Sequence, residues 1–396
     1  MQDQNKARSL FFRHLAPTSP EPLALHFERA EGSTLFSADG TEYLDMISGI
    51  SVSNLGHNHP EINKAVINQV EKHSHLMVYG EFIQDVQVSL AHLLAENLGE
   101  GFESVYFVNS GAEAVEGSMK LAKRYTGRHE IVSCRNAYHG STHGAMSIMG
   151  SETYKTSFRP LLPGTRLIRF NNIEDLQKIS SETACVIIEP VQAEAGVIVP
   201  EQGYLQALRK RCNECGTLLI FDEIQTGFGR TGSLFAFQKY GVKPDVIMLA
   251  KALGGGYPLG AFISSSQIMK SLSNDPILGH ITTFGGHPVS CAAAKASLEI
   301  ISMKGFLQEV NKKAALFKEL FSELPEGIHF NQSGLLMAIH LQEEKQCFDA
   351  ISKSIQEKLI TDWFLFASNA IRLAPPLIIK EEEIRHACRI ILNAIK

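Results

Sequence analysis

The chain has 396 residues, of which 44% are hydrophobic and 20% charged, as is ordinary for a soluble globular protein long enough for two domains or lobes. Its net charge of −5 and its lack of a long basic run argue against nucleic acid or an anionic membrane surface as a partner. No apolar run approaches the ~18 residues of a membrane span. The N-terminus also lacks an apolar signal core, and the seven scattered cysteines favour reduced thiols in the cytoplasm.

The N-terminal region favours an arm followed by a small meander of strands. Residues 1–22 are polar and interrupted by prolines, which is typical of a segment that packs on another part of the molecule. Residues 24–45 alternate apolar and polar side chains around two glycine turns. We therefore assign residues 1–45 to an N-terminal arm and a segment of a small lobe. A helix is expected over residues 61–73.

A strand that ends in Ser-Gly at the start of a helix is the first candidate binding feature. Residues 85–98 have helical apolar spacing, and residues 104–108 have the pattern of a short buried strand. The Ser110-x-x-Glu113 motif that follows has the form of a capping box and opens a helix to about residue 125. Free backbone N–H groups and the helix dipole favour an anion such as phosphate at this position. The alternative is that the motif only caps the helix.

Four further apolar runs predict a mostly parallel sheet. They lie at residues 131–134, 184–188, 218–221 and 246–250, with helix-like segments between several of them. Strands that alternate with helices form right-handed βαβ units. The sequence therefore predicts an α/β domain in this region.

The stretch from residue 218 to residue 256 carries the strongest chemical signal. Asp222 directly follows one apolar run, and Lys251 directly follows the next and precedes three glycines. Open α/β sheets bind ligands at the carboxyl ends of their strands. The alternative is that Asp222 caps a helix and Lys251 is solvated, as most such residues are. A lysine between a buried strand and a glycine run favours the functional interpretation.

The C-terminal third predicts a second lobe. Residues 261–264 are expected to form an edge strand of the sheet, and a helix over about residues 289–303 leads out of it. Residues 310–396 mix helical and strand patterns, as in an α+β lobe. With the lobe boundary near residue 285, the predicted divisions are the N-terminal segment 1–45, a large domain 46–285 and a small lobe 286–396.

The lysine, the aspartate and the helix start together suit pyridoxal phosphate. Lys251 supplies an amine for the cofactor aldehyde, and Asp222 supplies a carboxylate that keeps the pyridine nitrogen protonated, so that the ring accepts electrons. The helix start at Ser110 supplies a phosphate site.

The chain resembles the class III (ω-amino acid type) aminotransferases of fold type I over most of its length. The most specific match is LIFDEIQTGFGRTG, followed at the family's spacing by PDV and AKALGGGYPLGA. Supporting matches are NSGAEA at 109–114, YHG at 138–140, EPVQAEAG at 189–196, TTFGG at 282–286 and IRLAPPL at 371–377. The resemblance implies an α/β fold in which helices flank a mostly parallel sheet of the seven-stranded type. It also implies a smaller α+β lobe built from the C-terminus and the N-terminal segment.

The resemblance implies cofactor-binding roles for the matching residues. Lys251 would bond to the cofactor and then move the proton between substrate and cofactor, and Asp222 would pair with the pyridine nitrogen. The remaining cofactor contacts would be Ser110, Gly111 and Ala112 at the phosphate, Tyr138 and Ile224 on the two faces of the ring, Gln225 at the phenolic oxygen, and Glu189 nearby. Thr283 would bind the phosphate from the partner subunit, which implies a homodimer.

The resemblance also implies substrates, namely an amino donor and an oxo acid. Glu194 and Arg372 match a pair in which the arginine binds a substrate carboxylate and the glutamate neutralises the arginine when no carboxylate is present. The arginine fork meets a carboxylate with two parallel hydrogen bonds. 2-Oxoglutarate and glutamate are therefore expected in one half-reaction.

The chain departs from the ornithine and acetylornithine members at Ser141. Those members carry an arginine there, after the glycine of the YHG-type motif, and it binds a substrate carboxylate. One carboxylate clamp is therefore missing, unless Lys155 or Arg159 replaces it, and specificity for ornithine, acetylornithine or 4-aminobutyrate does not transfer directly.

Three other functions compete with transamination. An aminomutase or amino-acid epimerase would use the same Lys251 and Asp222. A nucleotide-binding oxidoreductase is disfavoured because the glycines at 254–256 do not form GxGxxG after a first strand. A non-catalytic relative would have no reason to keep Lys251 and Asp222. No metal site is expected, because Cys212 and Cys215 form a CxxC without a second pair.

Overall fold

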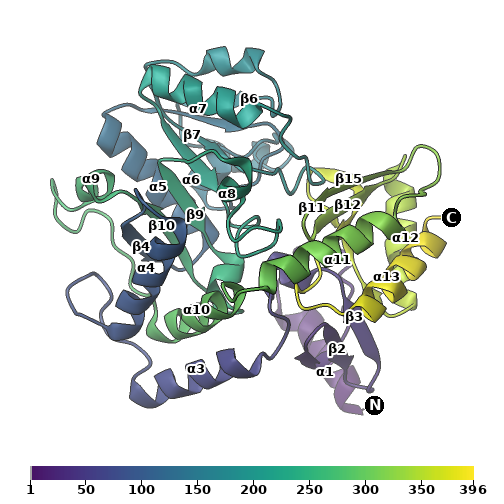
Figure 1. The fold of residues 1–396 in the computed structure, drawn as a ribbon. Helices are drawn as coiled ribbons and strands as arrows, with labels where there is room; N and C mark the ends of the chain where they lie inside the picture. The colour runs from purple at the N-terminus through teal and green to yellow at the C-terminus, as the bar shows by residue number, and fades with distance from the viewer. Residues whose placement is uncertain (1) are drawn as a thin grey trace.

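The computed structural model describes residues 2–396, with side chains from Lys6 onward. It contains three sheets: one of seven strands and two of four strands. Figure 1 shows the seven-stranded sheet and its helices on one side, and the C-terminal elements beside the N-terminal strands on the other. No helix among residues 2–396 is both long and apolar enough to cross a membrane. The cytoplasmic location stays a prediction.

The seven-stranded sheet forms the frame of the large lobe. Its strand order is β4-β10-β9-β8-β7-β5-β6. The strands are β4 (Ser104–Val108), β5 (Glu130–Cys134), β6 (Thr165–Ile168), β7 (Thr183–Ile188), β8 (Leu218–Asp222), β9 (Val246–Leu249) and β10 (Gly260–Ser264). Strands β6, β5, β7, β8 and β9 pair in parallel, whereas β10 runs antiparallel to β9 and to β4. The predicted mostly parallel sheet is confirmed.

The expectation that residues 261–264 form an edge strand is wrong. Strand β10 lies inside the sheet between β9 and β4, and β4 forms that edge. The five residues of β10 are all buried, because both neighbours cover its hydrogen-bonding sides and helices cover its faces. Strand β6, at the other edge, carries Arg166, which is exposed, and its pattern was too weak to be predicted.

Helices cover both faces of this sheet. Alternate residues of one strand point to opposite faces: Ile187 belongs to a core that includes residues of α5 (Gly111–Thr126), whereas Val186 belongs to another core that includes residues of α4 (Asp85–Leu98) and α7 (Tyr204–Cys215). Smaller elements of this lobe are α2 (Ser48–Ser51), α3 (Pro60–Lys72), α6 (His143–Ser147), α8 (Ala236–Tyr240) and α9 (Ser266–Met269). Both faces being apolar explains why the strands read as continuous apolar runs.

The small lobe contains two four-stranded sheets and three C-terminal helices. One sheet joins β11 (His329–Ser333), β12 (Leu336–His340), β15 (Ala367–Leu373) and β14 (Asp362–Phe364). The helices are α11 (Phe306–Leu320), α12 (Glu344–Gln356) and α13 (Glu381–Ala394). Buried residues of these elements form one core, which includes Phe317, Met337, Ile371 and Ile391.

The N-terminal segment joins the small lobe through the other sheet. Strands β1 (Phe27–Glu31), β2 (Thr34–Ser37) and β3 (Glu42–Asp45) form the predicted antiparallel meander, after helix α1 (Gln2–His14). Strand β3 pairs in parallel with β13 (Leu359–Ile360), more than three hundred residues later in the chain. The predicted small-lobe segment at the N-terminus is thus part of that lobe.

Helix α10 (Pro288–Ile301) connects the lobes. It packs on α3 and α4, and its buried residues Cys291 and Leu298 belong to the core of the large sheet. The lobe boundary near residue 285 stays a prediction, and the large core reaches as far as Ile301.

Candidate active site

Lys251 and Asp222 line one cavity of about 750 Å³ at the carboxyl ends of β8 and β9. Asp222 is the last residue of β8. Lys251 begins the short helix η3 (Lys251–Gly254), two residues after β9 ends, and has a left-handed backbone with φ of 49°. A non-glycine residue in that region is uncommon and is found at functional sites. The structure brings the two predicted groups together where open α/β sheets place ligands.

Asp222 is buried and held in a fixed orientation. Its Oδ1 accepts a hydrogen bond from the backbone N–H of Ile224 at 3.0 Å, and its Oδ2 lies 2.7 Å from Nδ1 of His139. His139 is buried and lines the same cavity. A carboxylate with two such contacts presents a defined charge to a ligand.

The start of α5 forms another wall of this cavity. Ser110, Gly111 and Ala112 all line it. Ser110 is the N-cap, and its hydroxyl accepts from the backbone N–H of Glu113 at 3.2 Å. The Glu113 carboxylate accepts from the backbone N–H of Asn109 at 2.7 Å, so the predicted capping box is formed with its return bond shifted by one residue. The unpaired first N–H groups of a helix this long suit a phosphate.

The loop after β5 approaches this helix start closely. A Cβ built on Gly140 would lie 2.7 Å from Cβ of Ala112, and a Cβ on Gly111 would lie 2.9 Å from Cδ1 of Ile224. A Cβ on Gly140, which has a φ of 126°, would also meet the backbone of Ala112 at 2.9 Å, so glycine is required there, whereas at Gly111 the side chain of Ile224 would have to move. The cavity is therefore a slot between the loop, the helix start and Ile224.

The remaining predicted cofactor residues of this chain line the same cavity: Tyr138, Glu189, Ile224 and Gln225. Burial raises the pKa of Glu189 well above its usual value, and the nearby charge of Asp222 adds to this effect. Its Oε2 is buried without a hydrogen-bond partner. Such an atom calls for a proton or for a ligand group in the cavity.

Burial lowers the pKa of the Lys251 amine, although the charges of Glu194, Asp222 and Glu189 act in the opposite direction. A lowered pKa makes the neutral, nucleophilic form of a lysine more accessible. Lys251 also lines a second, adjoining cavity of about 1270 Å³, which Tyr138, Ser141 and Thr142 share with the first.

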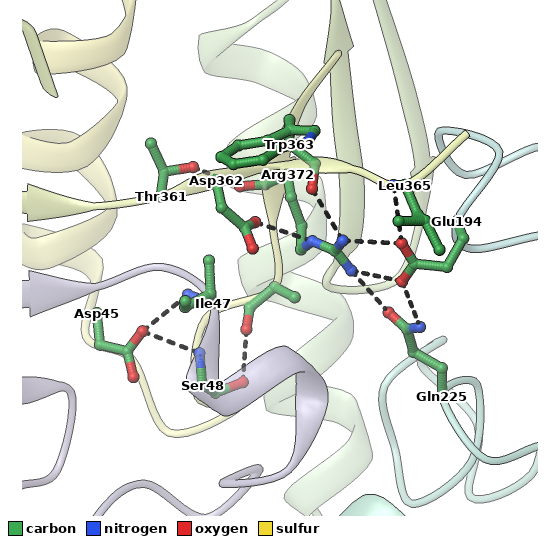
Figure 2. A network of polar contacts seen from close by, with 11 residues as sticks. Asp45, Ile47, Ser48, Glu194, Gln225, Thr361, Asp362, Trp363, Leu365 and Arg372 are labelled. Atoms are coloured by element: carbon green, nitrogen blue, oxygen red, sulfur yellow. Dashed lines mark hydrogen bonds and ion pairs between the residues drawn. The ribbon is translucent and has the colours of Figure 1, made fainter. Parts of the chain in front are cut away.

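Arg372 and Glu194 both line that second cavity and form a bidentate ion pair. Nη1 and Nη2 of Arg372 donate to Oε1 and Oε2 of Glu194 at 2.7 and 2.9 Å. Arg372 also donates from Nε to Oδ1 of Asp362 at 2.9 Å and from Nη2 to the carbonyl of Trp363 at 2.9 Å. Gln225 lies beside the pair and donates to Glu194 at 3.1 Å. Figure 2 shows the guanidinium at the centre of this network.

Burial and the neighbouring charges shift the pKa values of the carboxylates in this network. Burial alone would raise the pKa of Glu194, but the charge and hydrogen bonds of Arg372 outweigh it and lower that pKa to about 2. Burial raises the pKa of Asp362 to about 6, although Arg372 partly offsets the effect. At neutral pH two carboxylates therefore face one guanidinium.

Neither suggested substitute for a second carboxylate clamp reaches the cavities. Lys155 is buried and donates to the carbonyl of Met149 at 3.0 Å, and it also pairs with Glu152 at 3.3 Å. Arg159 pairs with the same Glu152 at 2.6 Å. Ser141, in contrast, lines both cavities, and its hydroxyl lies 3.0 Å from that of Tyr138.

Thr283 is the one predicted site residue that lines neither of these two cavities. It is exposed in the loop that precedes α10. Its role in a partner subunit stays a prediction.

The residues present fit pyridoxal phosphate. The slot is lined by a helix start suited to a phosphate, by a buried carboxylate held by two contacts, and by a lysine whose pKa is lowered. Glu189, whose buried Oε2 has no hydrogen-bond partner, also lines this cavity.

The family model "Aminotransferase class-III" matches residues 15–395 of this chain. The chain belongs to the class III aminotransferases. It is a pyridoxal-phosphate-dependent aminotransferase, which acts on an amino donor and an oxo acid.

Individual relatives of this aminotransferase agree with that assignment. It is 38% identical to an acetylornithine aminotransferase from Clostridium acetobutylicum over 382 residues, which cover 93% of this chain and 96% of the relative. Ornithine aminotransferase from Toxoplasma gondii has a similar structure, with a TM-score of 0.90 and 26% identity over 99% of this chain and 94% of that one. A PLP-bound amine transaminase from an uncultivated Pseudomonas species is also similar in structure, with a TM-score of 0.88 and 26% identity. The match covers 96% of this chain and 97% of that one.

Two residues of the aminotransferase site were missed from the sequence. His139 lies inside the YHG motif and contacts Asp222 across 83 positions, and the only available signal was a titratable residue in a loop after a strand. Asp362 carried no signal, since it reaches Arg372 only through the pairing of β14 with β15.

Proposed function

We propose that this aminotransferase takes an amino group from a donor and passes it to 2-oxoglutarate or a related oxo acid. The observation that carries the proposal is the Arg372–Glu194 pair beside Lys251. When Glu194 turns away, the fork of Arg372 is free to hold a substrate carboxylate. When the substrate has none, Glu194 neutralises the arginine. One cavity then serves two substrates of different charge.

Pyridoxal phosphate, when bound, supplies the aldehyde that accepts the amino group and the ring that stabilises a carbanion. We assign Ser110, Gly111 and Ala112 to holding its phosphate, and Asp222 to keeping its ring nitrogen protonated. His139 orients Asp222. Tyr138, Ile224, Gln225 and Glu189 would hold the ring.

Lys251 does the proton transfer in this proposal. Its amine lines both cavities, so it faces the cofactor slot and the substrate space at once. Because burial lowers its pKa, the free amine takes a proton from the substrate carbon and returns it on the cofactor side.

We further propose a homodimer in which Thr283 reaches the cofactor phosphate of the partner subunit. In support, Thr283 lies between Ile281 and Phe284, which are 48% and 54% exposed. An adjacent groove carries Phe82 and Ile83, exposed at 54% and 91%. Exposed apolar surface of this kind marks an interface, and the mass in solution checks it.

Membership of the class III aminotransferases favours transamination over the aminomutase or epimerase alternative. Consumption of the oxo acid distinguishes the two, since an isomerase returns the amino group to the same carbon skeleton.

Replacement of Lys251 tests the mechanism. Lys251→Ala removes the amine, so we expect loss of the absorbance of the lysine-bound cofactor and a fall in turnover of at least about a thousandfold. Absorbance spectra and steady-state rates measure both. Lys243→Ala, at a lysine that lines neither active-site cavity, is the control. A Lys251→Ala enzyme with normal spectrum and turnover would disprove the assignment.

A further inference from the structure

The second cavity is mainly apolar away from Arg372. Side chains that form its wall are Met146, Met149, Tyr154, Phe158, Trp363 and Leu365. Phe158 and Trp363 are 53% and 44% exposed, so they offer free apolar surface. A substrate chain that covers such surface gains affinity in proportion to the area removed from water.

Among the described residues, the two cavities offer no free lysine or arginine to a substrate, although His143 also lines the second cavity. Within residues 2–396, the lysines and arginines that line them are Lys251 and Arg372. Lys251 serves the cofactor. An arginine has five N–H donors, and those of Arg372 face Glu194, Asp362, Gln225 and the carbonyl of Trp363.

The carboxylates of the substrate space are occupied as well. Glu194 and Asp362 both line it and both pair with Arg372, so a distal ammonium would also lose its hydration without a free partner. Ser141 and Thr142, which carry hydroxyl groups, also line it. A donor with a distal carboxylate would have to break the Arg372–Glu194 pair or lose its hydration without a charged partner, and both cost free energy.

We propose that the preferred amino donor is a primary amine whose chain ends in an uncharged apolar group, aliphatic or aromatic, and that Ser141, Phe158 and Trp363 set this preference. The proposal rests on the transaminase function and names the donor class for the same site. The half-reaction balances as amine plus pyridoxal phosphate giving aldehyde plus pyridoxamine phosphate. The amine carbon loses a C–H bond and its C–N bond, and the cofactor takes up the two electrons.

A matched series of donors tests the proposal. Pentylamine, 5-aminopentanoate and 1,5-diaminopentane share a five-carbon chain and differ in its distal group: methyl, carboxylate or ammonium. We mix each with the holoenzyme and follow the cofactor absorbance in a single half-reaction. The apparent second-order rate constant for pentylamine should exceed those of both others by at least about tenfold.

The outcomes separate this inference from the function on which it rests. A ratio below about tenfold for either charged donor overturns the donor class but leaves transamination intact. No spectral change with any amine or with glutamate, although cofactor is bound, overturns transamination itself.

Substitutions locate the preference in the cavity. Ser141→Arg supplies the missing cation and should raise the rate constant for 5-aminopentanoate relative to pentylamine by at least about tenfold. Ser352→Arg, on the exposed face of α12, is the control and should leave the ratio unchanged. Phe158→Ala removes an exposed ring without opening the core, and should lower the rate constant for pentylamine several-fold but not that for 5-aminopentanoate. Unchanged ratios in both cavity variants overturn the assignment.

Discussion

At the scale of single residues, the position of Arg372 depends on more than its pair with Glu194. Asp362 and the carbonyl of Trp363 hold the same guanidinium from β14, the strand next to its own. If Glu194 leaves to admit a carboxylate, these two contacts keep the arginine in place. Asp362 also keeps a negative charge near the incoming carboxylate, so it opposes the binding that its geometry supports.

The charge of Asp362 predicts a pH dependence of carboxylate binding. Because burial raises its pKa to about 6, the group is charged at pH 7.5 and mostly neutral at pH 5.5. The KM for 2-oxoglutarate should therefore fall roughly threefold or more when the pH is lowered from 7.5 to 5.5. In Asp362→Asn the charge is absent at both, so KM should be low at pH 7.5 and change little. Steady-state kinetics at several pH values measure this.

Asp349→Asn on the exposed side of α12 is the matched control and should keep the dependence of the unmodified enzyme. If Asp362→Asn also keeps it, another group titrates in this range and the role given to Asp362 is wrong.

The site residues differ in how far the sequence could predict them. Lys251 and Asp222 could be found because Asp222 ends one buried strand and Lys251 lies two residues after another, so local pattern fixes where each lies. Arg372 came from the resemblance, since an arginine in a strand is otherwise an ordinary surface cation. His139 and Asp362 depend on contacts made by the folded chain, which no local pattern records.

At the scale of elements, the position of α5 on the sheet decides where the phosphate site lies. Gly117 of α5 packs on the ring of Phe262 in β10, and a Cβ there would overlap that ring. The helix thus lies closer to the sheet than one with a side chain at that position could. The position of β10 inside the sheet could not be predicted from its sequence, because a five-residue buried strand gives no sign of whether neighbours flank it on both sides.

Gly117→Ala should destabilise the enzyme by about 1–3 kcal/mol, because the added methyl group forces the helix and the ring apart. Cofactor affinity should fall with it, as the helix start shifts relative to the loop at Gly140. Urea unfolding and cofactor titration measure the two effects.

Gly254→Ala provides the comparison for stability. A Cβ at Gly254 meets its nearest neighbour at 3.6 Å, an ordinary contact, so stability should stay the same or rise slightly. Equal stability of the two variants would show that α5 has room to move.

At the scale of the whole molecule, one buried arginine joins the two lobes. Nη1 of Arg230 donates to the carbonyls of Leu335 and Pro375 at 3.0 and 2.7 Å, and Nη2 donates to Ser48 and Asn54 at 3.1 and 2.5 Å. Burial lowers the pKa of Arg230 to about 9. The sequence contains it in GFGRTG, but nothing local shows that it is fully buried or which segments it joins.

Arg230→Lys should destabilise the fold by about 3 kcal/mol, because an ammonium cannot reach four acceptors at once and leaves buried oxygens unpaired. Arg385→Lys, at an exposed position on α13, should change stability by no more than about 0.5 kcal/mol. Thermal and urea unfolding compare the two. Similar stability for both variants would mean that water satisfies the acceptors in place of the guanidinium.

The pairing of β3 with β13 bears on how the chain is made. A ribosome releases the N-terminal strands first, yet Leu44 and Asp45 find their partners Leu359 and Ile360 only when nearly the whole chain has been synthesised. The large sheet needs none of these residues and has its strands available by Ser264. Domains fold as units during synthesis, so the nascent chain would hold Lys251 in a folded cofactor slot before Arg372 has left the exit tunnel. Cofactor capture can then precede any ability to recognise a carboxylate substrate.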